Sequence, residues 1–382
     1  MLKIKLISFL YVNFIKKIFF KFDPELVHDR MLVFGEVLGR FLCFRLLTKV
    51  VFYFEDRRLE QVVSGITFKN PVGLSAGFDK NAKLLKILPN VGFAHAEFGS
   101  VTYGAYEGNP KPRLYRLPKS KALTVYYGLK NEGVKPILNR IQENFSPKGD
   151  FIIGLSVART NSDDTAELNA GILDYTKCVK EVVDSGLANY ITINISCPNT
   201  FGGEPFTTPS RLERLLSSIA KVKTSIPLFV KMPIDLPWEE FDKLLEIIIK
   251  YKFDGAVIGN LTKNRQSKLI KDLIPEEIKG GISGLPTQHL SDELIRRTYL
   301  KYGNKLVIVG VGGIFSAEDA YRKIKFGASL VQLITGMIYE GPQLIGSINR
   351  GLRDLLIADG FSNVSEAIGI DSRKKSTVTI KR

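Results

Sequence analysis

The sequence predicts an α/β protein, a (β/α)8 barrel preceded by a helical extension. From residue 70 onward, eight short runs rich in β-branched residues alternate with longer stretches of helical periodicity. Strands that alternate with helices form parallel sheets, and eight of them close a barrel of about 250 residues. Because the chain has 382 residues, roughly 100 residues remain for additions outside the barrel.

The expected strands lie at residues 72–76, 95–101, 151–157, 190–196, 228–232, 255–260, 306–310 and 330–333. Amphipathic stretches such as 209–224 and 237–251 separate them, as an outer ring of helices requires. A doubly wound open sheet is the alternative, and it predicts the fingerprint G-x-G-x-x-G after the first strand. Residues 74–80 read LSAGFDK instead. The sequence therefore favours the closed barrel, the TIM barrel architecture.

The amino-terminal segment is basic and apolar at once. Residues 1–22 carry five lysines around an apolar run at 6–15, which is shorter than the roughly 20 residues that a spanning helix needs. A secretory signal is disfavoured because acidic Asp23 and Glu25 follow and no small-residue cleavage site does. A second apolar stretch covers 31–54. We expect two amphipathic helices, which either pack on the barrel or anchor the chain at a membrane surface.

The composition limits which kinds of binding partner and which kinds of cofactor we expect. The net charge is +15, which attracts either a nucleic acid or an anionic membrane. Residues 1–58 hold eleven Lys and Arg against six Asp and Glu, beside the apolar helices, so a membrane is favoured and no nucleic acid is expected. Three cysteines without CxxC spacing predict neither a disulfide framework nor a cysteine-rich metal centre.

Candidate site residues follow the expected strands, because barrel active sites lie at the carboxyl ends of their strands. They include two lysines, several asparagines and one cysteine, with no histidine and few carboxylates, so the site is suited to anions and poor in metal ligands. Glycines after the seventh strand and Thr335 after the eighth match a phosphate site, although tight turns would also explain them. These residues are Ala76, Gly77, Lys80, Ser100, Ser156, Asn194, Cys197, Asn199, Lys231, Gly259, Asn260, Gly312, Gly313 and Thr335.

Such a set suits a phosphate-bearing organic cofactor that supplies the redox chemistry. Cys197 is then a candidate proton-transfer group, because nearby lysine charge lowers the pKa of a thiol. A strand-end cysteine alone is more often a small buried hydrophobe. The surrounding sequence, Asn-Ile-Ser-Cys-Pro-Asn over 194–199, has polar side chains on both sides of Cys197. This favours a solvent-accessible pocket around the thiol over a buried packing position.

Six stretches together are highly specific for one family. They are FKNPVGLSAGFDK at 68–80, GNPKPRLYRL at 108–117, NEG at 131–133, NISCPNT at 194–200, GGISG at 280–284 and VGVGG at 309–313. Through them the chain resembles the dihydroorotate dehydrogenases, flavin barrels of pyrimidine (UMP) biosynthesis, over most of residues 20–360.

The resemblance implies a site for FMN and for dihydroorotate. It gives the FMN contacts to Ala76, Gly77, Lys80, Ser100, Ser156, Asn194, Lys231, Gly259, Gly284, Gly312, Gly313, Ile334 and Thr335. It gives the substrate contacts to Lys80, Gly128, Leu129, Asn194, Asn199 and Asn260, and the role of catalytic base to Cys197. The base takes the C5 proton of dihydroorotate while the C6 hydride passes to the flavin, and Lys231 stabilises the reduced anion.

The amino-terminal pair resembles the quinone-binding extension of the membrane-associated class. Its Pro-Glu-x-x-His signature stands at 24–28, and Arg116 matches a position that helps to receive the quinone. The resemblance thus implies His28 and Arg116 as quinone-site residues and ubiquinone or menaquinone as the final electron acceptor. It also implies a peripheral location on the cytoplasmic side of a membrane.

Several positions depart from the family pattern. The membrane-associated class uses a serine base, whereas Cys197 is the base of the soluble class. Val125 stands where the family has an asparagine that helps to hold the orotate carboxylate, and a missing partner for a carboxylate costs about 1–3 kcal/mol. Other departures are Ser156 for an asparagine, Gly259 and Leu261 for hydroxyl residues, and Ile334 for an aromatic residue.

The expected domains are the membrane- and quinone-binding extension at 1–60, the FMN-binding barrel at 61–365 and a basic tail at 366–382, whose residues 372–382 are expected to be solvated and disordered. Residues 102–150 are expected to form a small excursion that roofs the site. Two other functions stay open at this point. One is a flavin reductase resembling the tRNA dihydrouridine synthases, which share Asn-x-x-Cys-Pro. The other is a catalytically impaired flavin-binding protein of the membrane surface, supported only by Val125.

Overall fold

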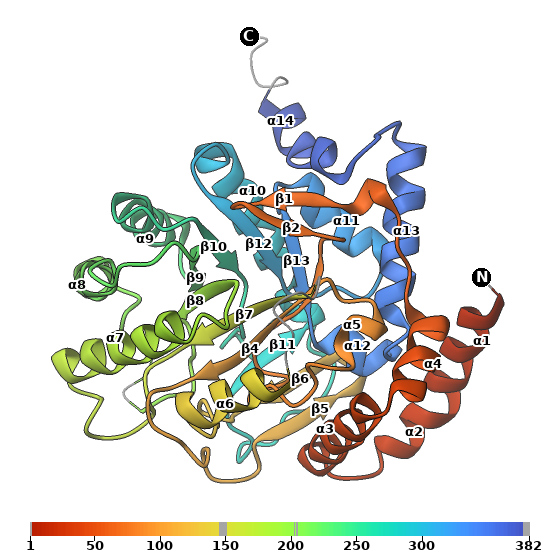
Figure 1. Ribbon diagram of the computed structural model, residues 1–382, viewed down its shortest axis with the longest axis horizontal. Coiled ribbons are helices and arrows are strands. Elements are labelled where there is room, and N and C mark those ends of the chain that lie inside the picture. The colour runs from red at the N-terminus through yellow and green to blue at the C-terminus, as the bar shows by residue number, and fades with distance from the viewer. Residues whose placement is uncertain (1, 145–150, 202, 204, 377–382) are drawn as a thin grey trace.

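The computed structural model describes residues 2–144, 151–201, 203 and 205–376, and its centre is a closed barrel of eight parallel strands (Figure 1). Around the barrel the strand order is β10-β12-β13-β3-β4-β7-β8-β9. The expected (β/α)8 barrel is confirmed, and the open-sheet alternative is excluded because β13 pairs with β3. The strands are β3 (Val72–Leu74), β4 (His95–Val101), β7 (Ile152–Val157), β8 (Tyr190–Asn194), β9 (Leu228–Met232), β10 (Gly255–Ile258), β12 (Val307–Val311) and β13 (Leu330–Leu333).

Both faces of these strands are covered, which explains their nearly unbroken apolar runs. All seven residues of β4 are buried, for example. The covering helices place their apolar residues at i, i+3, i+4 and i+7, as the buried Leu212, Leu215, Leu216 and Ile219 of α8 illustrate. These helices are α5 (Leu88–Val91), α6 (Val134–Asn144), α7 (Leu168–Ser185), α8 (Pro209–Ile219), α9 (Trp238–Lys250), α10 (Gln288–Tyr302), α11 (Ala317–Lys325), α12 (Thr335–Glu340) and α13 (Leu344–Ala358).

Three barrel strands end two residues earlier than expected, at Leu74, Asn194 and Ile258. The residues that follow leave the barrel and turn into its mouth. A small antiparallel sheet roofs that mouth, formed by β5 (Leu114–Leu117), β6 (Ala122–Val125) and β11 (Gly281–Gly284). The roofing excursion was expected from 102–150, but the third strand from 281–284 was not. A hairpin of β1 (Gln61–Val63) and β2 (Ile66–Phe68) precedes the barrel.

The amino-terminal extension forms more helical segments than the two expected. A first helical segment runs through α1 (Leu2–Leu10), the π-helical turn η1 (Tyr11–Ile15) and α2 (Lys16–Phe19). The second apolar stretch divides into α3 (Pro24–Arg40) and α4 (Leu42–Phe52), because Phe41 adopts an extended conformation. Asp23 caps α3 by accepting a hydrogen bond from the Leu26 amide, and Pro24 occupies the first turn.

The extension lies along one side of the barrel, next to β5, α5 and α12 (Figure 1). Gly35 makes this close approach possible, since a Cβ there would lie 2.6 Å from Leu84 Cδ2. The buried carboxylate of Glu25 pairs with Arg113 at 3.2 Å, which ties the start of α3 to the barrel. None of the described helices is both long enough and apolar enough to cross a membrane.

The carboxyl-terminal tail is partly folded, against expectation. Residues 370–376 form α14 (Ile370–Ser376), in which Ser372 is fully buried and donates to the Phe326 carbonyl at 3.0 Å. The Arg373 guanidinium bonds the Tyr299 hydroxyl. A basic sequence therefore did not prevent packing here, because individual side chains found partners on α10 and α11. Residues 377–382 of the expected tail lie outside the described residues.

Candidate active site

A cavity of about 910 Å³ opens at the carboxyl ends of the barrel strands, below the roof sheet. Most of the candidate residues line it, although they come from seven separate segments of the chain. They are Ala76, Gly77, Lys80, Ser100, Gly128, Leu129, Asn194, Cys197, Asn199, Lys231, Asn260, Ile334 and Thr335. The barrel thus brings together, at the carboxyl ends of its strands, residues that lie far apart in the sequence.

A second cavity of about 510 Å³ adjoins the first and shares Ala76, Lys231, Asn260, Ile334 and Thr335 with it. The glycine candidates line this second cavity: Gly259, Gly284, Gly312 and Gly313. At these glycines the loops pack so closely on their neighbours that there is no room for a side chain. A Cβ on Gly312 would lie 2.7 Å from Thr287 Oγ1. Backbone N–H groups can therefore approach an anion directly, as phosphate sites require.

Two lysines, the half-buried Lys80 and the buried Lys231, dominate the electrostatics of the site. Burial lowers the pKa of Lys80 to about 8, and its ammonium lies 3.9 Å from the centre of the Tyr127 ring. Burial likewise lowers the pKa of Lys231, whose Nζ lies 3.3 Å from Ser75 Oγ. Among the described residues, neither cavity is lined by an Asp or a Glu. The two cations are therefore available to an anionic ligand.

A chain of hydrogen bonds holds the amide side chains in place. Asn194 Nδ2 donates to Ser100 Oγ at 2.8 Å, and Ser100 shares a 2.8 Å hydrogen bond with Ser156. Ser156 itself lies behind Ser100 rather than in the cavity wall. On the other side, Asn260 Nδ2 donates to Ser196 Oγ at 2.7 Å. The sequence reasoning missed Ser196, whose only signal was its place between Asn194 and Cys197.

Val125 and Leu261 both line the first cavity and give it an apolar wall. Val125 ends β6, where it pairs with Leu114 and Gly281. Its carbonyl accepts a hydrogen bond from Asn199 Nδ2 at 2.8 Å. The backbone at Val125 thus orients Asn199, while the valine side chain can offer no hydrogen bond to a ligand.

A third, apolar cavity of about 1370 Å³ lies between the extension and the barrel, and we call it the side tunnel. Arg116 lines it, donates to the Phe22 carbonyl at 2.7 Å and lies 4.6 Å from the centre of the Phe20 ring. His28 lines both the side tunnel and the first cavity. Four further residues do so as well: Phe78, Leu114, Leu123 and Ile338.

His28 is held neutral at the wall between these two spaces. Burial lowers the pKa of His28 to about 3, and its Nε2 is buried without a hydrogen-bond partner among the described residues. The Tyr127 hydroxyl is buried in the same state, and its ring lies 6.4 Å from that of His28. Tyr127 was not predicted from the sequence, although its neighbours Val125, Gly128 and Leu129 were singled out.

The short helix α12 connects the two spaces. Its first residue, Thr335, lines both inner cavities, whereas Met337 and Ile338 line the side tunnel. The Tyr11 hydroxyl donates to the Ile338 carbonyl at 2.8 Å, and the Phe20 ring packs edge-on against Tyr339 at 5.5 Å. The amino-terminal helices are thus attached to the same element that borders the site.

Within the described residues, no group of three or more His, Cys, Asp or Glu side chains is placed to hold a metal ion. The fit of a flavin rests on the features present. A Cβ on Gly77 would meet only Ile334 Cδ1, at 3.7 Å, so Gly77 leaves open space in the cavity wall. The glycine loops of the second cavity, together with Lys80 and Lys231 of the first, suit a planar group that carries a phosphate. Fold and site together define a flavin-dependent oxidoreductase of the α/β-barrel class.

Residues 58–356 match the dihydroorotate dehydrogenase family. The chain is 38% identical over 316 residues to "Dihydroorotate dehydrogenase (quinone)" of Haloarcula marismortui, covering 83% of this chain and 87% of that one. It is 36% identical to the protein of the same name from Nautilia profundicola, over 96% and 98% of the two chains. The crystal structure of ligand-free DHODH from Eimeria tenella superposes with a TM-score of 0.81 at 28% identity, covering 91% and 99%. The chain belongs to the dihydroorotate dehydrogenase family, in its quinone-dependent branch.

Proposed function

We propose that this protein oxidises dihydroorotate to orotate in pyrimidine biosynthesis, with FMN as the hydride acceptor and a membrane quinone as the final electron acceptor. One observation carries this proposal. The cavity at the strand ends, which is lined by Lys80, Lys231 and three asparagines, shares a wall with the apolar side tunnel, so a polar substrate and an apolar acceptor can approach one cofactor from two sides. The family and its quinone-dependent relatives support the reaction and favour neither alternative raised on the sequence.

FMN fits the two inner cavities by the character of their walls. The phosphate would be held by backbone at Gly284, Gly312 and Gly313, with Thr335 beside them. Lys231 would lie against the anionic edge of the ring system. The remaining contacts proposed from the sequence, Ala76, Gly77, Lys80, Ser100, Asn194, Gly259 and Ile334, line the same cavities, and Ser156 supports Ser100. When bound, FMN supplies the acceptor for the substrate hydride and the route by which two electrons reach the quinone.

The chain's own residues would bind the substrate and move one proton. Lys80 offers a charge to the substrate carboxylate, while Asn194, Asn199 and Asn260 offer amides that the surrounding hydrogen bonds hold in place. Gly128 and Leu129 form part of the wall around the substrate. The Cys197 thiolate takes the proton from substrate C5 and becomes a thiol, as the hydride leaves C6. The new double bond joins C5 and C6.

The quinone would enter through the side tunnel. Neutral His28 at the inner end can donate or accept a hydrogen bond without bringing a charge into an apolar space. Arg116 lies on the tunnel wall beside the amino-terminal helices, where a polar headgroup of the quinone would pass it.

The extension would hold the tunnel entrance at a membrane surface. Its helices expose large apolar side chains, among them Phe9, Phe14, Ile18, Leu42 and Val50. Lys17 and Lys21 are exposed beside them. Exposed apolar area of this extent identifies an interaction surface, and basic residues around it match anionic lipid headgroups. We therefore place the protein at the membrane periphery on the cytoplasmic side.

Anaerobic spectroscopy tests the function directly. Dihydroorotate added to the purified flavoprotein should bleach the flavin absorbance, and a quinone added afterwards should restore it. A protein that retains its flavin but is not bleached by dihydroorotate would overturn the proposal.

A further inference from the structure

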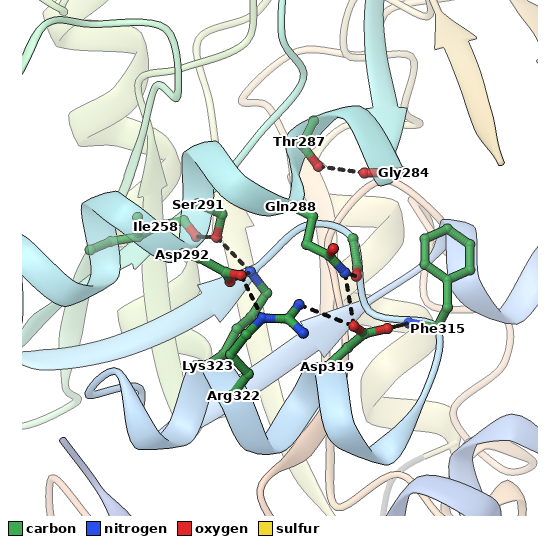
Figure 2. Close-up of polar contacts among 11 residues, drawn as sticks. Ile258, Gly284, Thr287, Gln288, Ser291, Asp292, Phe315, Asp319, Arg322 and Lys323 are labelled. Atoms are coloured by element: carbon green, nitrogen blue, oxygen red, sulfur yellow. Dashed lines mark hydrogen bonds and ion pairs between the residues drawn. The ribbon is translucent and has the colours of Figure 1, made fainter. Parts of the chain in front are cut away.

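A buried ion network lies behind the second cavity and takes no part in the proposed reaction (Figure 2). Lys323 is fully buried, and its Nζ lies 2.7 Å from Asp292 Oδ1 and 3.0 Å from Ser291 Oγ. Arg322 pairs with Asp292 at 2.8 Å and with Asp319 at 3.0 Å. Two cations and two carboxylates thus join α10 to α11 with no net charge.

One neutral side chain connects this network to the glycine loop after β12. Gln288, the first residue of α10, donates to the carbonyl of Gly313 and to Asp319 Oδ1, the latter at 2.9 Å. The other Asp319 oxygen accepts the Phe315 amide at 3.0 Å. Figure 2 shows Gln288, Arg322 and the Phe315 amide meeting at the Asp319 carboxylate. Asp319 therefore holds both Gln288 and the loop that Gln288 contacts.

Fixing the Gly313 carbonyl also fixes the next amide. In a planar trans peptide the carbonyl and the following N–H point in opposite directions. The carbonyl of Gly313 points at Gln288, so the Ile314 N–H points away from it, and Ile314 lines the second cavity. Gly313 is packed so closely that a Cβ on it would lie 2.3 Å from Gln288 Cβ. While Gln288 is in place, it therefore fixes the backbone conformation of the loop at Gly313.

The same helix start also holds a second loop of the cavity. Thr287 Oγ1 donates to the Gly284 carbonyl at 2.8 Å, and both residues line the second cavity. Thr287 and Gln288 are consecutive, so the position of α10 determines how the Gly284 and Gly313 loops face each other.

We propose that Gln288, held by Asp319 and the Arg322–Asp292–Lys323 ion pairs, is a positioning residue that shapes the anion-binding loop after β12 and makes the protein select phosphorylated over unphosphorylated flavin. The inference rests on the proposed function, which assigns the FMN phosphate to this cavity. Gln288 does not line the cavity, so it acts through the backbone of Gly313 and Ile314.

Charge alone would predict a different pattern. Removing a carboxylate from behind a phosphate should tighten phosphate binding if the effect were electrostatic. Positioning predicts the reverse for Asp319→Asn, because the amide would lose a carboxylate oxygen that anchors Gln288, Arg322 or the Phe315 amide. The sign of the change therefore separates the two explanations.

The test compares FMN with riboflavin, which has the same ring system without the phosphate. Flavin-free full-length Gln288→Met would be titrated with each flavin, following the quenching of flavin fluorescence, and FMN release from the holoenzyme would be timed. Loss of this hydrogen bond should weaken FMN binding by about three- to tenfold and leave riboflavin binding unchanged. Asp319→Asn should weaken FMN in the same direction.

A matched control is Gln61→Met. Gln61 is a buried glutamine that also donates to a backbone carbonyl, that of Ser329, but on β1 and away from the cavities. The Gln61→Met variant should bind both flavins as the unmodified protein does. Equal weakening of FMN and riboflavin in Gln288→Met, or tighter FMN binding in Asp319→Asn, would overturn the inference. A wild-type protein that binds FMN no better than riboflavin would also overturn it, and one that binds no flavin would overturn the proposed function itself.

Discussion

The Lys80 ammonium lies over the ring of Tyr127, 3.9 Å from its centre, and both residues line the first cavity together with His28. The ring replaces water as the neighbour of a buried cation, and such cation–π contacts are worth about 0.5–2 kcal/mol. Burial nevertheless lowers the pKa of Lys80 from 10.5 to about 8. A group that must attract a carboxylate is thus charged only up to mildly alkaline pH.

The first prediction concerns this pH dependence. The ratio kcat/KM for dihydroorotate should fall as pH rises above about 8, because Lys80 of the free enzyme loses its proton there and with it the attraction for the carboxylate. Steady-state kinetics across pH 6–10 would measure the alkaline limb. In Lys80→Arg the limb should disappear, since a guanidinium stays protonated throughout this range. An alkaline limb that persists in Lys80→Arg would contradict the assignment.

The second prediction concerns the base. Cys197→Ala should slow flavin reduction by dihydroorotate by about 10²–10⁴-fold, the range that general-base catalysis supplies, without loss of bound flavin. Stopped-flow absorbance would measure this half-reaction alone. Cys197→Ser should keep part of the rate and move its optimum to higher pH, because an alcohol is harder to deprotonate than a thiol. Full activity in the alanine variant would exclude Cys197 as the base.

The third prediction concerns the apolar wall. Val125→Asn should lower the KM for dihydroorotate by about tenfold, because a hydrogen bond to a charged group contributes about 1.5–3 kcal/mol. The backbone carbonyl that orients Asn199 is retained in this variant. Val125→Leu serves as the control and should leave KM unchanged or raise it. If Val125→Asn binds dihydroorotate no better, this position does not face the carboxylate.

The fourth prediction separates the two half-reactions. Arg116→Met should leave bleaching by dihydroorotate unchanged and should slow reoxidation by quinone by about tenfold, because Arg116 lines the side tunnel and not the inner cavities. Anaerobic bleaching followed by quinone addition measures both steps in one sample. Equal losses in both steps would show a general structural defect instead.

The fifth prediction concerns the membrane. Phe9 and Phe14 are each 56% exposed, and their rings pack edge-on with centres 6.1 Å apart. Replacing both with serine should weaken vesicle binding by at least about tenfold, since burying one such side chain contributes about 1.5–3 kcal/mol. Co-sedimentation with anionic vesicles measures this. Tyr103→Ser, an exposed aromatic residue on the barrel, should bind vesicles as the unmodified protein does.

The site residues at the strand ends were predictable, because a barrel places the carboxyl ends of all its strands on the same side of the molecule. Residues as distant as Lys80 and Thr335 could be assigned to one cavity on that rule alone. Strand β11 could not be predicted, because its sequence Gly-Ile-Ser-Gly lacks the β-branched alternation of a strand. It becomes one only by pairing with β6, a contact between segments more than 150 residues apart.

Residues that act between elements were also hidden from the sequence. Tyr127 has no motif of its own, and its importance follows from lying between Lys80 and His28. Ser156 shares a hydrogen bond with Ser100 and does not line either inner cavity, an arrangement that the sequence did not indicate; its contact with the cofactor stays a prediction. The break between α3 and α4 at Phe41 was not predicted either, although Gly39 stands two residues before it; a Cβ on Gly39 would lie 3.2 Å from Lys86 Cβ.

The six-residue helix α12 has a practical consequence. From Thr335 to Glu340 it is about 9 Å long at 1.5 Å per residue, and it borders the cofactor cavity at one end and holds Tyr11 and Phe20 of the extension near the other. Because Met337 and Ile338 of this helix line the side tunnel, a molecule that fills the tunnel contacts the helix. We therefore expect a ligand in the side tunnel to change the visible spectrum of bound flavin, which can be measured without turnover and without a labelled ligand.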